Sequence, residues 1–87
     1  MDIHNLIHMA NRIGQFFESY SDRNEALEGI SNHIQKFWDP RMRHHLLVYL
    51  DATGQGDLLP LVAEAVQSHR VHLASGWPAT DAKALKT

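Results

Sequence analysis

The sequence predicts an all-α domain, a small compact bundle of four helices with a short C-terminal tail. Apolar residues recur at the three- and four-residue spacing of amphipathic helices along four segments. Aspartates stand at helix-capping positions before three of them. No segment has the alternating pattern of a β-strand. We expect the helical domain to span residues 1–76 and the tail residues 77–87.

The first predicted helix spans residues 2–20, with the aspartate at its start as the N-cap. Gly14 lies within its apolar half, where a glycine costs helix stability, so we expect another helix to approach closely there. The opposite half carries His4, His8 and Asn11 and is mostly amide and imidazole, which is compatible with burial against a partner. A solvated face is the commoner use of such residues. The apolar half contains Ile3, Leu6, Ile7, Ala10, Ile13, Phe16, Phe17 and Tyr20.

The second predicted helix begins after Asp22, which forms a capping-box pattern with the glutamate three residues later, and runs to about Phe37. Gly29 either permits a close helix contact or simply weakens the middle of the helix. We expect Phe37 to be in the core, whereas Trp38 is compatible with both the core and a partner contact. The apolar side of this helix contains Ala26, Leu27, Ile30, Ile34, Phe37 and Trp38.

A proline marks the start of the third predicted helix. Because proline disfavours helical geometry in the residue before it, the second helix must end by Asp39, and Pro40 suits the first turn of a new helix. We expect this helix to span Arg41–Asp51, with Asp39 as its cap. Arg41 falls on the polar side. Arg43 falls at the edge of the apolar stripe, where its guanidinium needs a carboxylate, carbonyls or a partner chain, because an unpaired buried charge is costly.

The fourth predicted helix follows a loop at residues 53–57, which contains two glycines but no phosphate-binding pattern. We expect the helix to span Leu59–Ala74, with a proline in its first turn and Gly76 as its stop. Its apolar stripe includes His69. The tail begins at Trp77.

Composition excludes several classes of function. The absence of cysteine removes disulfides, iron–sulfur ligation and thiol catalysis, and fits a reducing compartment. Eight Lys and Arg against ten Asp and Glu give a net charge of −2, which argues against a nucleic-acid partner. No apolar run approaches the roughly 20 residues of a membrane span. The first residues lack the basic and apolar regions of a signal peptide.

Seven histidines raise the question of a metal site. His4 and His8 are four residues apart on one helical face, but they lack both the glutamate of the zinc-protease helix and a third ligand. His69 and His72 have the same weakness. We therefore predict no metal ligand, and we interpret His33 and His69 as packed histidines that hydrogen-bond helix ends or neighbouring side chains.

No catalytic or cofactor-binding residue is predicted either. A helical domain of this size has little interior for a pocket of several hundred Å³, about the volume that a small-molecule site needs. The serines stand in no elbow or triad context. A free metal- or ligand-binding domain built on the histidines remains a separate alternative, which calorimetric titration with zinc or nickel would test.

The predicted partner interface centres on the turn between the second and third helices. Trp and Arg are over-represented among the residues that dominate binding energy. The arginines of the turn also suit a phosphate-bearing group. The alternative is that the tryptophan closes the bottom of the bundle and the arginines cap it. The predicted interface residues are Trp38, Arg41, Arg43, His4, His8 and Asn11.

Three stretches carry a resemblance to a known family. They are Met1–Phe17, Glu28-Gly-Ile-Ser-Asn-His-Ile-Gln-Lys-Phe-Trp-Asp-Pro-Arg-Met-Arg43, and the Leu58–His69 helix. The second stretch is the specific one, since amphipathic helices alone match many proteins. Together the three cover most of residues 1–75, and in them the chain resembles the delta subunit of soluble NAD-dependent formate dehydrogenase.

The resemblance implies a non-catalytic accessory subunit of a cytoplasmic enzyme that oxidises formate to carbon dioxide and reduces NAD. In that family the alpha subunit carries a molybdenum or tungsten bis-pterin guanine dinucleotide cofactor and iron–sulfur clusters, and the beta and gamma subunits carry flavin and further clusters. The delta subunit carries no redox centre, in keeping with the absence of cysteine here.

The expected partner is thus the catalytic alpha subunit, whose assembly or stability this chain would support. The alternative is a maturation chaperone that protects or delivers the pterin guanine dinucleotide cofactor. A small domain with a partly apolar docking face is also expected to self-associate when its partner is absent.

Overall fold

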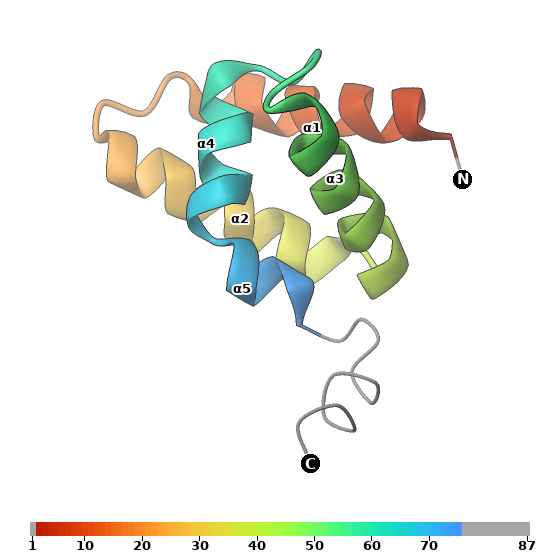
Figure 1. Cartoon of the computed structure of the whole chain (residues 1–87). Helices are drawn as coiled ribbons and strands as arrows, with labels where there is room; N and C mark the ends of the chain where they lie inside the picture. Colours follow the sequence, from red (N-terminus) through yellow and green to blue (C-terminus); the bar gives the residue numbers. More distant parts are fainter. Residues whose placement is uncertain (1, 76–87) are drawn as a thin grey trace.

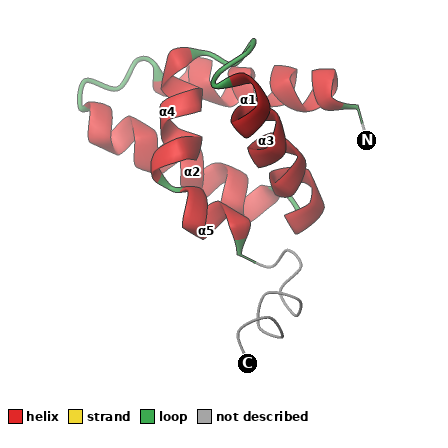
Figure 2. Cartoon of the chain, viewed as in Figure 1, coloured by secondary structure: helices red, strands yellow, loops and turns green. Residues whose placement is uncertain are grey.

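A computed structural model describes residues 2–75 of the chain. Within that range it contains five helices and no strand, so the predicted all-α class is confirmed (Figure 1, Figure 2). The predicted tail at residues 77–87 and the predicted stop at Gly76 lie outside the described residues. The helices are α1 (Ile3–Phe17), α2 (Arg23–Phe37), α3 (Pro40–Thr53), α4 (Pro60–Ser68) and α5 (Arg70–Ala74).

Aspartates begin the first three helices, as predicted. Asp2, Asp22 and Asp39 each accept a hydrogen bond from a backbone N–H of the first turn, at 3.0, 2.9 and 2.9 Å. Each bond satisfies a donor that would otherwise lack a partner inside the helix. Pro40 takes the first position of α3, so that the chain leaves one helix at Phe37 and enters the next three residues later.

Two predicted boundaries are corrected. α1 ends at Phe17 and not at residue 20. Just beyond this end, the Ser19 hydroxyl donates to the carbonyl of Phe16 at 3.2 Å, and such a hydrogen bond competes with the helical pattern. α3 is longer than predicted and continues to Thr53. It stops at Gly54, whose φ of 80° lies in the left-handed region that favours glycine.

The predicted fourth helix is in fact two helices, so the described chain is not a simple bundle of four. The break falls at His69, whose φ of −116° and ψ of 28° are not helical. The Ser68 hydroxyl donates to the carbonyl of Glu64 at 2.6 Å, and the His69 ring Nδ1 lies 3.2 Å from the carbonyl of Ala65. Side chains that bond carbonyls of the preceding turn bend or end helices. After the bend, an ion pair between Arg70 and Asp51 at 2.6 Å joins α5 to α3.

One continuous core receives residues from all five helices. α2 packs against α1 and α4, and α5 packs against α3 and α2. Three residues predicted on apolar faces are exposed and lie outside this core: Phe16 is 66% exposed, Phe37 is 65% exposed and Tyr20 is 42% exposed. Phe37 is the last residue of α2 and lies only about 20° around the helix from the fully buried Ile30, so its exposure reflects what packs beside the end of α2 and not its angular position.

Two glycines let the helices approach closely. A Cβ at Gly14 of α1 would overlap Cγ2 of Val62 in α4, which confirms the close contact predicted at this position. A Cβ at Gly29 of α2 would overlap the ring of Phe17, so Gly29 permits a close contact and does not merely weaken its helix. In Figure 1, α4 crosses in front of α1, and α2 also lies behind α4.

We expect Gly14→Val to lower the free energy of unfolding by about 2 kcal/mol, because overpacking a core typically costs 1–3 kcal/mol. Val62 is fully buried and has little room to move. Gln15→Val places the same side chain on the exposed neighbouring position and is expected to stay within about 0.5 kcal/mol of the parent chain. Urea unfolding followed by circular dichroism measures both. Equal midpoints for the two variants would contradict the close contact of α1 with α4.

Candidate protein-binding surface

The turn between α2 and α3 separates its residues into buried and exposed ones. Trp38 is 4% exposed and belongs to the core, and its backbone N–H closes α2 by donating to the carbonyl of Ile34 at 2.9 Å. Of the two positions that the sequence left open for Trp38, the structure therefore places the side chain in the core. Only an edge of it lines a surface hollow. Arg41 is exposed on the first turn of α3.

Arg43 is the buried charge of this region. Its side chain is on the buried side of α3 and is 5% exposed. Nε and Nη1 are buried, and neither has a hydrogen-bond partner within residues 2–75. Leaving a buried donor unsatisfied costs about 1–3 kcal/mol, and more when the group is charged. The predicted need of Arg43 for a partner is thus not met by the described part of its own chain.

The polar side of α1 is divided between solvent and the fold. His4 and His8 are exposed, in keeping with either of the two uses predicted for this side. Asn11 is not available in the same way. Its Nδ2 donates to the carbonyl of Asp57 at 3.0 Å, and its Oδ1 accepts the N–H of Leu59 at 2.9 Å. Both polar ends of Asn11 therefore hold the α3–α4 loop against α1, and its predicted contact with a partner stays a prediction.

The histidines do not gather into a metal centre in the part of the chain described. No group of three or more His, Cys, Asp or Glu there has the geometry to hold an ion. His69 packs at the α4–α5 break, as predicted for a histidine near a helix end. His33 is exposed, and its ring lies 4.7 Å from that of Phe37, centroid to centroid. His33 thus belongs to the surface and not to the interior.

Sequence reasoning missed an exposed apolar groove between α1 and α2, which we call the aromatic groove. It consists of two adjoining hollows of about 370 and 330 Å³ that share Ile13 and His33. Phe16 and Phe37, exposed as noted above, stand on its two sides. The signal in the sequence was the angular position of Phe16, at the edge of the apolar half of its helix, whereas Phe37 falls within its apolar stripe and gave no such signal. The residues lining the aromatic groove are Met9, Arg12, Ile13, Phe16, Phe17, His33, Phe37, Trp38 and Met42.

Ring contacts hold the aromatic side chains of the groove in place. Phe16 and Phe17 meet edge to face, with centroids 5.0 Å apart and planes at 87°. Tyr20 stacks against Phe17 at 4.9 Å. Aromatic pairs in such arrangements contribute about 0.5–1.5 kcal/mol beyond the area that they bury. The exposed rings are thus supported by their neighbours and do not project singly into solvent.

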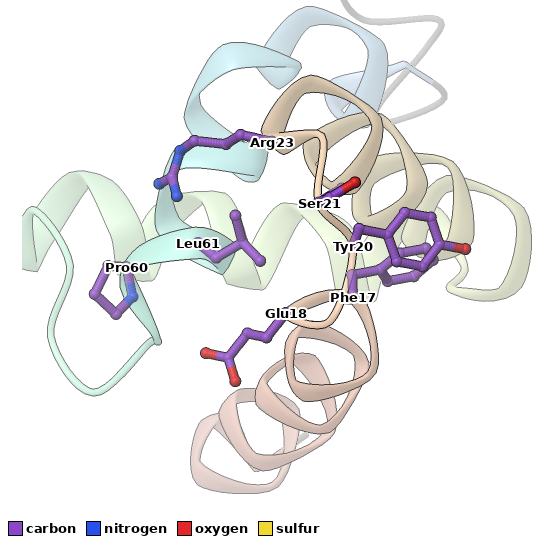
Figure 3. A pocket seen from close by; sticks show the side chains of 8 residues that line it. Phe17, Glu18, Tyr20, Ser21, Arg23, Pro60 and Leu61 are labelled. Carbon is purple, nitrogen blue, oxygen red and sulfur yellow. The ribbon is translucent and has the colours of Figure 1, made fainter.

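A further hollow of about 340 Å³ lies at the α1–α2 connection, on the other side of Phe17 and Tyr20. Figure 3 shows Glu18 and Arg23 reaching toward it from opposite sides, with Leu61 between them. Arg23 is already paired with Glu64. This hollow is therefore bordered by the carboxylate of Glu18 and the guanidinium of Arg23, and Glu64 already neutralises the guanidinium.

An exposed, supported aromatic groove on a small helical domain is typical of proteins that bind other proteins. A family model, described as the delta subunit of NADH-dependent formate dehydrogenase (FdsD), matches residues 5–66, which is most of the chain. The chain belongs to this delta-subunit family, and the resemblance found in the sequence is confirmed. No curated protein and no solved structure matches the chain. No helix in the described residues is long and apolar enough to cross a membrane.

We expect Arg43→Met to leave the isolated chain as stable as the parent or more stable, by up to about 2 kcal/mol. Methionine fills a similar volume without two unsatisfied donors, and such replacements of buried charges are often neutral or stabilising. Arg41→Met, at an exposed position, should change stability by less than about 0.5 kcal/mol. Urea unfolding of the full chain measures both. A loss of more than about 1 kcal/mol in Arg43→Met would show that this chain does satisfy the guanidinium.

Proposed function

We propose that this chain is a non-catalytic accessory subunit that docks on the catalytic alpha subunit of a cytoplasmic, molybdenum- or tungsten-containing formate dehydrogenase, and that it supports the assembly or stability of that subunit. Membership of the delta-subunit family supports the association with the dehydrogenase. The choice of the alpha subunit follows from the roles that the resemblance implies.

The observation that carries the docking role is the exposed aromatic groove. Two phenylalanine rings that are each about two-thirds exposed keep apolar surface in water that a partner would bury. Arg43 adds a second incentive, because its two unsatisfied donors gain an acceptor only from outside residues 2–75. Arg41, His4 and His8 are exposed and remain proposed contacts, whereas Trp38 offers only the edge that lines the groove.

A maturation factor that protects or delivers the pterin guanine dinucleotide is the second candidate. The exposed Arg41 favours it, because guanidinium groups pair well with phosphate. The two functions differ in stoichiometry. A subunit stays in the active complex, whereas a delivery factor leaves it once the cofactor is inserted.

We expect the purified active dehydrogenase to contain this chain in an amount equal to the alpha subunit. Quantitative mass spectrometry of the complex, purified through a tag on a subunit other than this chain, measures the ratio. Recovery of this chain with cofactor-free alpha subunit, and its absence from the active enzyme, would favour the delivery factor. Absence from both preparations would refute both candidates.

We expect Arg41→Gln to weaken binding to the alpha subunit by about 1–2 kcal/mol, since arginine is enriched among the residues that dominate interfaces. Arg23→Gln removes the same charge from another exposed position, where the loss of a surface ion pair costs at most about 1 kcal/mol of fold stability. The amount of each variant that co-purifies with the alpha subunit is compared by gel. Equal recovery of the two variants would remove the α2–α3 turn from the proposed interface.

A further inference from the structure

Two cations, Arg12 and Lys36, stand at the rim of the aromatic groove. Arg12 of α1 lines the larger of the two hollows, and its side chain has no hydrogen bond or ion pair within residues 2–75. On α2, the Nζ of Lys36 lies 5.7 Å from the centroid of the Phe37 ring. No carboxylate lines either hollow. Since the whole chain has a net charge of −2, this local excess of cations does not follow from composition.

Two other arginines of the described chain are already paired. Arg23 pairs with Glu64, and Arg70 pairs with Asp51 at 2.6 Å. Both pairs lie away from the residues that line the aromatic groove. Arg12 and Lys36 lie beside the groove and have no ion pair within residues 2–75, so an external carboxylate is a natural counter-charge for them.

The shape of the groove suits a helix. Met9, Ile13 and Phe16 follow one another at spacings of four and three residues along α1, so they extend over about 10 Å of helix length. His33 and Phe37 face them from α2. An amphipathic helix that inserts apolar side chains at three- and four-residue spacing into such a groove is a recurrent mode of recognition. Because ring contacts already hold the side chains on both sides of the groove, these side chains lose little conformational freedom when a helix binds.

We propose that the aromatic groove binds an amphipathic helix of another subunit of the dehydrogenase, with large apolar side chains in the two hollows and carboxylates beside Arg12 and Lys36. The proposal rests on the proposed function as a subunit and names the chemistry of its partner. A second copy of this chain is a poorer occupant. In a two-fold pairing of groove on groove, the same patch meets itself, which brings Arg12 and Lys36 toward their own copies.

The test is co-expression of the tagged full chain with the other dehydrogenase subunits, followed by quantification of the subunits retained. We expect the double variant Phe16→Ser with Phe37→Ser to retain about tenfold less, since truncation of central aromatic anchors causes losses of this size. Both residues are exposed, so the helical circular dichroism should be unchanged. The matched control is Val48→Ser with Val71→Ser, which removes two exposed apolar side chains outside the groove and should retain parental amounts.

The charge is tested separately. Arg12→Gln with Lys36→Gln should reduce retention by about fivefold or more and weaken its dependence on salt, because paired charges are screened by ions. The control Asn32→Asp with Gln67→Glu changes the net charge by the same amount at exposed positions outside the groove and should retain parental amounts. If the Arg12 and Lys36 variant also retains parental amounts, the occupant is not acidic and the proposed chemistry is wrong.

The outcomes separate this inference from the proposed function. If the parent chain retains no subunit, the proposed function itself fails. If the parent chain retains them and the Phe16 and Phe37 variant does so equally, the groove is not the docking site, while the function as a subunit stands. If sedimentation shows a dimer of the isolated chain that this variant converts to a monomer, with retention of the other subunits unchanged, the occupant is a second copy and the inference is overturned.

Discussion

α1 packs closely against two helices because glycines leave room for side chains at both contacts. Gly14 accommodates Val62 of α4, and this contact brings α1 onto the core. Gly29 of α2 accommodates the ring of Phe17. With Phe17 seated there, Phe16 meets it edge to face and is held toward solvent. The close contact at Gly29 therefore positions the ring of Phe17, and this ring supports the exposed Phe16 on one side of the aromatic groove.

The described chain has two features that cost free energy. The aromatic groove keeps large apolar side chains in water, and Arg43 keeps two N–H donors unsatisfied in the interior. A small domain has little stability to spare for such costs. Any partner that binds the folded state stabilises it by mass action, so a chain of this kind gains stability in its complex. Membership of a delta-subunit family agrees with this physical picture.

Much of the fold was predictable because its signals are local. Asp2, Asp22 and Asp39 cap helices through side chains that reach the very next turn, and Pro40 acts on the residue before it. The break at His69 was not predictable from apolar spacing, since the stripe continues through it to the buried Leu73. It results from hydrogen bonds that the side chains of Ser68 and His69 make to carbonyls of the preceding turn. Serine and histidine side chains make such bonds in some helices and not in others, so these residue types alone do not predict a break.

The candidate site likewise has some features that local sequence signals predicted and others that only the packing of the helices decided. The sequence by itself determined the helical class, the aspartate caps of the first three helices, the close approach at Gly14 and the position of Arg43 at the edge of an apolar stripe, because helical spacing sets the direction of each side chain. The tertiary structure alone decided that Trp38 is core, that Asn11 is used by the α3–α4 loop, and that Phe37 is exposed. The physical reason is that a helix shows which face is apolar, but only the neighbours packed against it determine how much of that face they cover.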